Sequence, residues 1–352
     1  MTSLRVLHIV RRYGPVGGME RTVWELTREL TRKGHSIKVL CEELCEEQSP
    51  PGVQLHCLGT VIPKPRWLAY LRFSRRVFQW LKAHPHPDWI IHSHERVRVH
   101  DITTFHGQPF ALVRSAPWWK RSSLRAYMNL WLEKRELCGV QVRKVVPCSS
   151  YVARLLIKHY PCVQNRLTSP VIPGITSITK RQHRTVSSSG GIIGFVGKEW
   201  KRKGLDTAVA IVHELRKSRP ALEFWVAGPE PVEVKHLFSS WNGGYRLLGN
   251  VNTQDLYSQL DLLLHPARME AYGLVIIEAM AACVPVVVSS ACGAADDMRK
   301  EHGAVLNLNE PVFVWAEAVR KLLDYQISPP GYQHTWEQFA EEYEGIYATL
   351  SE

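Results

Sequence analysis

The sequence predicts an α/β protein made of two doubly wound, Rossmann-like domains that face a central cleft. Two series of apolar, strand-like runs alternate with helical stretches, which is typical of parallel sheets covered by helices on both faces. Residues 170–191 are rich in proline, glycine, serine and basic residues and are expected to link the two series. The chain of 352 residues, 45% of them hydrophobic and 22% charged, is long enough for two globular cores.

The first series contains six predicted strands with four helices between them. The strands are 4–10, 36–40, 53–58, 89–93, 101–105 and 144–148, and the helices are 20–33, 67–82, 122–138 and 150–160. The run 4–10 is too short for a signal-peptide core and is followed by two arginines, so it is interpreted as the first strand of a cytoplasmic protein. No apolar run approaches the ~20 residues of a membrane span.

The second series follows the linker and has the same alternating pattern. Its predicted strands are 192–196, 223–227, 245–248, 262–265 and 286–289, and its helices are 205–217, 232–240, 253–259 and 275–282. A last helix is expected at 336–350. Since ligands bind at the carboxyl edge of such sheets, the residues just after each strand are the candidates for function.

Charge is distributed unevenly between the two series. Residues 1–175 contain 27 of the 44 Lys and Arg residues but only 12 of the 33 Asp and Glu residues. This asymmetry favours an anionic partner for the first half, either nucleic acid, anionic lipid or a phosphorylated glycolipid. The eight cysteines are scattered without a Cys-x-x-Cys pair and are expected to be reduced core residues.

Two carboxylates flank the most informative segment of the chain. Glu270 follows the predicted strand 262–265, and Glu278 lies about two turns into the next helix. Between them, the turn at Tyr272 and Gly273 and the helix start at Leu274 and Val275 offer backbone N–H groups to a phosphate.

This spacing and setting resemble the EX7E motif of the retaining glycosyltransferases of family 4, which have the GT-B fold. The resemblance implies that Glu270 lies by the donor sugar and that Glu278 binds the ribose hydroxyls of a nucleotide. It also implies that residues 1–175 bind the acceptor, that 176–334 bind the nucleotide sugar, and that the helix within 335–352 packs back on the first domain.

A basic loop follows the first strand of the second series, from Gly197 to Gly204. In family 4 a basic pair ahead of this glycine stabilises the departing diphosphate, and the match implies Arg202 and Lys203, with Lys198 as a reserve candidate. The alternative is a solvated basic loop.

Further segments resemble the family. The pair Gly17 and Gly18 after the first strand matches a loop that reaches the donor diphosphate or sugar, and the alternative is a simple turn. His106, at the end of strand 101–105, matches a histidine near the sugar, although a lone histidine is often structural. Val251 matches a position that touches the nucleobase.

The segment 66–80 mixes arginines with aromatic residues at helical spacing. Two interpretations stay open: a helix lying on an anionic membrane surface, or an amphipathic helix that docks its rings on the sheet. A block at 95–135 is similar to family 4 enzymes that extend the lipopolysaccharide core, although some of those have aspartate in place of His106.

The resemblance therefore implies a retaining, metal-independent glycosyltransferase with no cofactor. It is expected in the cytoplasm, either free or bound peripherally to the inner face of the cytoplasmic membrane. The donor is a nucleotide sugar, with UDP expected, and the acceptor is an anionic membrane-associated saccharide such as a lipopolysaccharide core. No Asp-x-Asp metal motif follows a strand, so no metal ligands are assigned. The alternatives are a nucleotide-sugar epimerase or hydrolase, and a basic nucleic-acid-binding protein, for which no recognisable motif is found.

Overall fold

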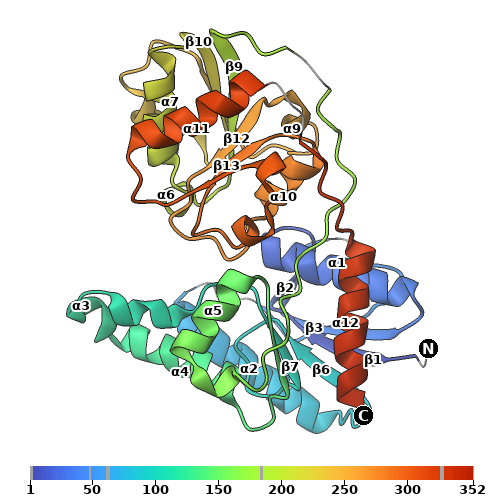
Figure 1. Cartoon of the computed structure of the whole chain (residues 1–352). Helices are drawn as coiled ribbons and strands as arrows, with labels where there is room; N and C mark the ends of the chain where they lie inside the picture. Colours follow the sequence, from blue (N-terminus) through green and yellow to red (C-terminus); the bar gives the residue numbers. More distant parts are fainter. Residues whose placement is uncertain (1–2, 47–48, 61–63, 183–184, 326–328, 352) are drawn as a thin grey trace. The chain divides into compact units, whose positions relative to one another are not determined.

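The computed structural model describes residues 3–46, 49–60, 64–182, 185–325 and 329–351. The chain divides into two units (Figure 1). Unit 1 combines Met1–Gly174 with His334–Glu352, and unit 2 is Ile175–Gln333. Residues 183–184 of the expected linker lie outside the described residues.

Unit 1 is built on a parallel sheet of six strands. Their order across the sheet is β5 (Gln54–Cys57), β3 (Ser36–Cys41), β1 (Arg5–Ile9), β6 (Ile90–Ser93), β7 (Ile102–Phe105) and β8 (Lys144–Pro147). Its longer helices are α1 (Gly18–Arg32), α2 (Arg66–Ala83), α4 (Leu124–Cys138), α5 (Ser150–His159) and α12 (Trp336–Ser351). The order reverses direction at β1, which makes the sheet doubly wound as predicted.

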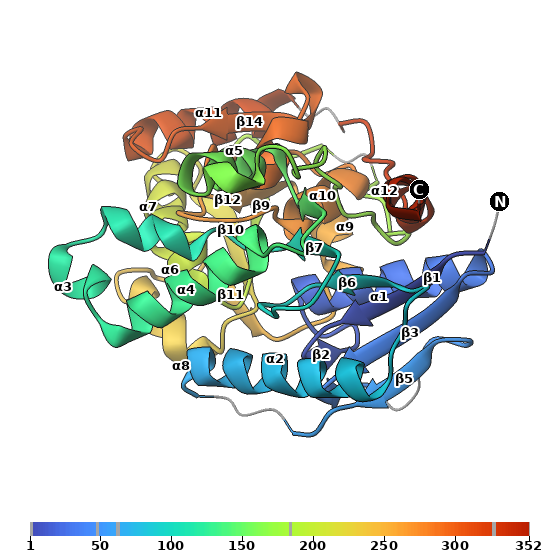
Figure 2. The same cartoon turned by 90° about the horizontal axis from the view of Figure 1, so that it is seen from below.

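Alternate residues of β1 serve the two faces of this sheet. Val6 joins a core with α1 and α12, whereas Leu7 and Ile9 join a second core with α2. Figure 2 shows α1 and α2 on opposite sides of the sheet. A strand that is buried on both faces has apolar residues on both, which explains why Val6, Leu7 and Ile9 stand close together in the sequence, with the buried His8 as the polar exception.

Helix α2 docks its aromatic residues on the sheet rather than presenting them to solvent. Phe73 is fully buried and Trp80 packs against the same core. Of the two interpretations of segment 66–80, the structure therefore favours the amphipathic helix. The exposed aromatic residues of unit 1 lie instead on the short helix α3 (Trp118–Arg121) and on α4.

Helix α12 closes the core of unit 1 although it follows unit 2 in the sequence. It lies beside α1 (Figure 1) and buries one face through Trp336, Phe339, Tyr343 and Tyr347, which recur at helical spacing. Two of these rings also form hydrogen bonds with the sheet. The Tyr347 hydroxyl lies 2.7 Å from His92 Nδ1, and the Tyr343 hydroxyl lies 2.7 Å from Thr104 Oγ1.

Unit 2 repeats the architecture with a second parallel sheet of six strands. Their order is β11 (Tyr245–Gly249), β10 (Ala221–Ala227), β9 (Gly190–Val196), β12 (Leu262–His265), β13 (Val286–Ser289) and β14 (Gly303–Leu306). Its helices are α6 (Trp200–Lys203), α7 (Leu205–Arg216), α8 (Pro231–Val234), α9 (Leu256–Gln259), α10 (Leu274–Ala281) and α11 (Val312–Tyr325). The prediction of two Rossmann-like sheets is confirmed.

Several predicted elements differ in extent. The helix expected at 232–240 is one turn of α8 followed by a 3-10 turn, Lys235–Phe238, and the helix expected at 253–259 is the single turn α9. Two elements of unit 2 were not predicted from the sequence: β14, which forms one edge of the sheet, and α11, which packs beside α7 in the core of unit 2. β14 is short and only partly buried, so its apolar pattern is weak.

The cysteines do not all follow the expectation of reduced core residues. A disulfide joins Cys138 at the end of α4 to Cys162, and Cys57 is exposed. No helix within the described residues combines the length and the apolar character needed to cross a bilayer.

Candidate functional site

Glu270 lies at the carboxyl edge of the unit 2 sheet, in the segment that connects β12 to α10. Its backbone is fixed by the neighbouring segment, because Glu270 N donates to Ala291 O at 3.0 Å and Gly293 N donates to Glu270 O at 3.1 Å. These bonds place the carboxylate just beyond the strand end, where doubly wound sheets bind ligands.

Gly273 makes the turn into α10. Its φ of 107° is in the left-handed region that favours glycine, and a Cβ at this position would lie 2.8 Å from Ile276 Cδ1. The helix that starts here carries Glu278, which is 8% exposed and accepts a hydrogen bond from the Tyr257 hydroxyl at 2.8 Å. Tyr257 therefore orients the second carboxylate of the motif.

Two cations from α6 meet the Glu270 carboxylate. Lys203 Nζ lies 2.7 Å and Arg202 Nη1 3.4 Å from Glu270 Oε2. Arg202 also pairs with the exposed Glu199 at 2.7 Å. The structure thus brings together three of the predicted site residues, Glu270, Arg202 and Lys203, at one corner of unit 2.

The charge state of Glu270 follows from this cluster. Burial by itself would raise the pKa of the carboxyl group, but the neighbouring His265 ring and the cations of Lys203 and Arg202 outweigh burial and hold its pKa far below the usual range. His265 Nε2 lies 3.7 Å from Glu270 Oε2, and burial lowers the pKa of this histidine. The corner therefore presents one carboxylate with two fixed cations at neutral pH.

Two glycines make room for this arrangement. A Cβ at Gly197 would lie 2.1 Å from Lys203 Cδ, and a Cβ at Gly204 would lie 2.1 Å from the backbone oxygen of Pro266. The first glycine leaves space for the lysine side chain, and the second lets α6 approach the end of β12. The glycines that bracket the basic loop thus position the Lys203 ammonium beside Glu270.

The other predicted residues of unit 2 surround the same connection or lie on adjoining loops. Tyr272 is buried, with its hydroxyl 3.2 Å from that of Tyr332. Leu274 and Val275 open α10 and are partly exposed. Lys198 is exposed after β9, and Val251 is 39% exposed after β11. Lys198 lies outside the Glu270 cluster, since among the described residues only Lys203, Arg202 and His265 pair with that carboxylate.

The remaining predicted residues belong to unit 1. Gly17 caps α1, which begins at Gly18, and its carbonyl accepts the first helical bond from Arg21 N at 2.9 Å. A Cβ at Gly17 would lie 2.3 Å from Glu20 Oε2, so this glycine leaves space for a side chain of the first turn. Both glycines are accessible at a helix start.

His106, just after β7, is the outer member of a chain of histidines. His106 Nε2 lies 2.9 Å from His94 Nδ1, and His94 Nε2 lies 3.0 Å from His8 Nδ1. Burial lowers the pKa of His106 and of His8 to about 3 and also lowers the pKa of His94, so the three rings are neutral. A neutral ring has one N–H, so the direction of donation must be the same along the whole chain.

A fourth histidine extends this network toward α12. The ring centroids of His92 and His94 are 4.1 Å apart, and His92 bonds to Tyr347 at 2.7 Å and to Thr104 at 2.8 Å. His8, His92 and His94 form the one group among the described residues whose ligand atoms are close enough to hold a metal. Their ring nitrogens already bond to one another, to His106 and to hydroxyl groups, except Nε2 of His8. A metal would have to replace those bonds.

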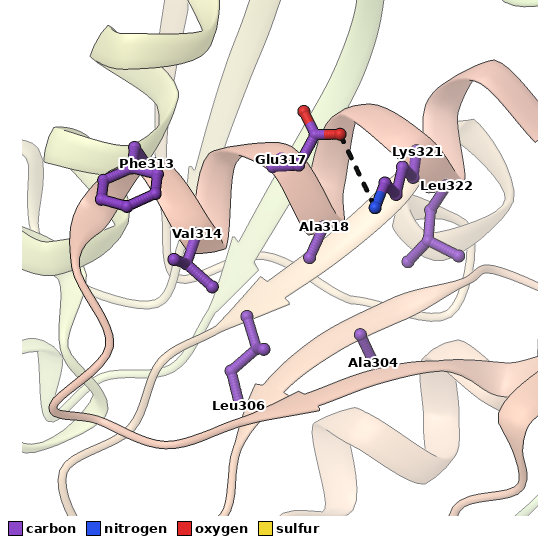
Figure 3. A pocket seen from close by; sticks show the side chains of 8 residues that line it. All are labelled: Ala304, Leu306, Phe313, Val314, Glu317, Ala318, Lys321 and Leu322. Atoms are coloured by element: carbon purple, nitrogen blue, oxygen red, sulfur yellow. Dashed lines mark ion pairs between the residues drawn. The ribbon is translucent and has the colours of Figure 1, made fainter.

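A separate apolar pocket of about 430 Å³ lies on unit 2 between α11 and β14 (Figure 3). It is lined by Leu306, Phe313 and neighbouring side chains, with the Glu317–Lys321 ion pair at its rim. None of the predicted site residues lines it.

Tyr257, His94 and His8 were not predicted from the sequence. Tyr257 positions Glu278, and His94 and His8 belong to the chain of histidines that ends at His106. The spacing of His92 and His94 was an available signal, because alternate residues of a strand point to the same face. Tyr257 had no such signal, since it lies 21 residues before Glu278 in the sequence and on a different helix.

Comparison with known proteins identifies two family profiles in the chain. The profile described as Glycosyltransferase Family 4 matches residues 16–173, and the profile described as Glycosyl transferases group 1 matches residues 190–325. The lipopolysaccharide glucosyltransferase WaaG of Escherichia coli is 30% identical in an alignment that covers 46% of this chain and 49% of that enzyme. The glycogen synthase of Mycobacterium tuberculosis is 24% identical in an alignment that covers 91% of this chain and 86% of that enzyme.

Solved structures show the same fold over nearly the whole chain. The crystal structure of WaaG superposes with a TM-score of 0.79 at 21% identity and covers 98% of this chain and 95% of that one. The structure of HepE from Anabaena in complex with UDP and glucose superposes with a TM-score of 0.67 at 15% identity and covers 99% of each chain.

Proposed function

The chain is a GT-B glycosyltransferase with a family 4 domain and a group 1 domain, and from this premise we propose that it is a retaining, metal-independent enzyme. In this proposal it uses a nucleotide sugar, with UDP as the nucleotide, and glycosylates a membrane-associated saccharide of the lipopolysaccharide-core type. The relative WaaG is named a lipopolysaccharide glucosyltransferase, which supports the acceptor. HepE, solved with UDP and glucose, supports the donor class.

The observation that carries the proposal is the cluster of Lys203, Arg202 and Glu270 beside the turn into α10. Lys203 Nζ and Arg202 Nη1 lie within 3.4 Å of the Glu270 carboxylate, and Arg202 also pairs with the exposed Glu199, so both cations are held at this corner. The turn at Gly273 adds the unpaired backbone N–H groups of a helix start. Together these groups suit a diphosphate that lies between the cations and α10, with the ribose hydroxyls at Glu278.

The proposed reaction breaks the bond between the sugar C1 and the diphosphate oxygen and forms a bond from C1 to an acceptor oxygen on the same face of the ring. Negative charge develops on the departing diphosphate, and Arg202 and Lys203 stabilise it. Glu270 and His106 orient the donor sugar, with Glu270 ionised and His106 neutral. The leaving phosphate takes the acceptor proton, so no protein base is assigned, and Gly17 and Gly18 let the unit 1 backbone approach the substrates.

Peripheral contact with an anionic membrane is part of the proposal, and its best support is an aromatic surface on α3 and α4. Trp118, Trp119, Leu124 and Tyr127 form this surface and are each more than 60% exposed. The cations Lys120, Arg121 and Arg125 lie between them in the sequence. Exposed rings interleaved with basic side chains are typical of segments that lie at a lipid headgroup layer.

The double variant Arg202→Ala/Lys203→Ala tests the function directly. It should raise the transition-state barrier by about 2–4 kcal/mol, comparable to the loss of a preorganised oxyanion donor, which corresponds to a fall of roughly 30–900-fold in kcat. The donor is first chosen with a panel of nucleotide sugars in a thermal-shift assay, because binding raises the melting temperature.

Lys201→Ala is the matched control, because Lys201 is an exposed cation of the same helix and stacks on Trp200 instead of pairing with Glu270. Near-normal turnover of the double variant would refute the assignment. Release of free sugar without acceptor, or isomerised donor, would identify the hydrolase or epimerase alternative. A salt-sensitive gel shift with nucleic acid and no nucleotide-sugar binding would identify the nucleic-acid-binding alternative.

A further inference from the structure

Four arginines line a pocket of about 640 Å³ on unit 1, away from the residues discussed so far. Arg72 and Arg75 come from α2, Arg135 comes from α4, and Arg98 comes from the segment between β6 and β7. Leu68 and Leu71 add apolar surface to the lining. No residue that lines the pocket is acidic.

Two of these guanidinium groups are held in place by their neighbours. Arg98 stacks on the ring of Phe78, with its Cζ 3.6 Å from the ring centroid. Arg135 donates through Nη2 to Ser74 Oγ at 3.0 Å and to Arg96 O at 3.1 Å. Its Nε is buried and has no hydrogen-bond partner within the part of the chain that the structure describes. The guanidinium groups of Arg98 and Arg135 are therefore fixed at the wall of the pocket.

The charges of the pocket lack counterions. Nearby arginines are paired: Arg76 on the same helix lies 3.0 Å from Glu42, and Arg96 lies 2.9 Å from Glu133. In the described residues none of the four pocket arginines forms an ion pair with a carboxylate.

The arginines also repel one another. Burial and the positive charge of Arg98 lower the pKa of Arg135. The charge of Glu136 raises the pKa of Arg135 but does not outweigh these two effects. Holding several cations together without an acid costs free energy, which an anionic ligand would recover.

We propose that this arginine pocket binds the phosphoryl group of a phosphomonoester, on a saccharide or on a lipid. The planar fork of a guanidinium matches phosphate oxygens bidentately, and several forks converge here beside the apolar surface that a sugar ring or glycerol backbone would contact. The site lies wholly within unit 1, whereas the cations that stabilise the donor diphosphate lie in unit 2. The further step of assigning the phosphoryl group to the acceptor rests on the proposed function, but phosphate binding itself does not.

The test is isothermal titration calorimetry of the full chain with inorganic phosphate and with glucose 6-phosphate, in the absence of any sugar donor. Arg72→Gln/Arg75→Gln should weaken binding at least about tenfold, because charge-assisted hydrogen bonds are lost. Both side chains are exposed, so the variant is expected to keep the melting temperature of the wild type. Lys120→Gln/Arg121→Gln is the matched control, since it removes two cations from exposed positions of unit 1 outside the pocket.

Two further arms separate the sources of the signal. Arg202→Ala/Lys203→Ala should bind phosphate as the wild type does, and loss of binding in that variant would place the anion at the donor site and overturn the proposal. Vesicles of phosphatidylcholine with and without phosphatidic acid distinguish a lipid phosphate from a soluble one, and binding of either that depends on Arg72 and Arg75 supports the pocket.

Equal weakening by the Lys120/Arg121 control would show diffuse surface attraction and refute the pocket. Absence of binding to every probe would refute it as well. Neither result depends on transferase activity, so a failure here leaves the proposed function to be judged by its own experiment.

Discussion

His94 Nδ1 lies 2.9 Å from His106 Nε2, and this contact ties a candidate substrate-binding ring to the buried core of unit 1. Along the chain from His8 to His106, donation runs either outward or inward. Outward donation leaves an unpaired lone pair on the buried Nε2 of His8, whereas inward donation leaves an unpaired N–H there. With outward donation, His94 donates to His106 Nε2, and the Nδ1–H of His106 is available to a ligand. His94 is therefore a positioning residue for His106.

Substitutions of His94 test this role, because the two amides replace different ring nitrogens. His94→Asn places an amide near the position of Nδ1 and keeps a partner for His106, whereas His94→Gln reaches the position of Nε2 and keeps a partner for His8. We expect kcat to fall about three- to tenfold more in the Gln variant, the equivalent of one buried hydrogen bond. Steady-state kinetics measure it, and equal activity of the two variants would rule out the positioning role.

Glu278 is expected to determine the preference for ribose. The wild type should bind UDP about 10–100-fold more tightly than 2′-deoxyuridine diphosphate, because a hydroxyl bonded to a carboxylate is lost in the deoxy ligand. Glu278→Gln should bring the two affinities close together, as measured by calorimetry. Tyr257→Phe, which removes only the hydroxyl that orients the carboxylate, should reduce the preference less. A Gln variant with the full ribose preference would show that the hydroxyls bind elsewhere.

The hydroxyl of Tyr347 should contribute to the stability of unit 1. Tyr347→Phe leaves His92 Nδ1 buried without this partner and is expected to lower the free energy of unfolding by about 1–3 kcal/mol. Denaturant unfolding followed by tryptophan fluorescence measures the change. Tyr325→Phe is the control, because Tyr325 is 69% exposed and its substitution should be neutral. The same loss in both variants would contradict the assigned contribution.

Stability should also depend on pH through the histidines of unit 1. Burial lowers the pKa of six of them, to about 3 for His8 and His106 and to about 4 for His100; the other three are His92, His94 and His159. As pH falls from about 6.5 toward 4, these histidines bind protons in the unfolded chain but stay neutral in the folded chain, so the free energy of unfolding decreases.

Four carboxyls act in the opposite direction. Burial raises the pKa of Glu95 to about 8 and of Glu136 to about 7, and it also raises the pKa of Glu25 and Asp101, so each favours the folded state less as pH rises through its titration range. Because the histidines outnumber them, unit 1 should be most stable between about pH 6 and 7. Denaturant midpoints measured from pH 4.5 to 8 check this, and a flat profile below pH 6.5 would contradict the neutral state of the histidines.

The aromatic surface on α3 and α4 should govern binding to lipid vesicles. Trp118→Ser/Trp119→Ser is expected to reduce co-sedimentation with anionic vesicles at least about tenfold, because two rings no longer enter the headgroup layer. Phe313→Ser is the matched control, since Phe313 is 65% exposed on unit 2. Unchanged vesicle binding of the tryptophan variant would show that unit 1 contacts no membrane through this surface.

The parts of the fold that depend on local pattern were predictable. Buried parallel strands such as β1 and β12 are rich in apolar residues, and the Glu270–Glu278 segment combines the end of such a strand with a glycine turn and a largely buried, apolar helix. β14 was missed because the strand is short and half exposed. The pairing of Cys138 with Cys162 was missed because sequence spacing does not reveal connectivity.

The site was predictable to the same extent. The basic loop showed that Arg202 and Lys203 follow a strand, but not that Lys203 contacts Glu270, which is 67 residues away. A helix that lies on lipid and a helix that docks on the sheet can both have the mixture of arginines and aromatic residues found at 66–80. Only the packing of Phe73 in the core distinguishes the two cases. Contacts between distant segments depend on the complete fold, which periodicity does not encode.

The position of α12 in the core of unit 1 has a consequence for biosynthesis. The ribosome delivers the six strands of the first sheet early, but the rings of Trp336, Phe339, Tyr343 and Tyr347 emerge only after all of unit 2. Residues 175–333 form a continuous segment, which can fold before α12 has been synthesised. The first half cannot complete its core until then, because one face of its sheet lacks α12. We therefore expect a chain truncated after residue 333 to combine a protease-resistant second half with a protease-sensitive first half.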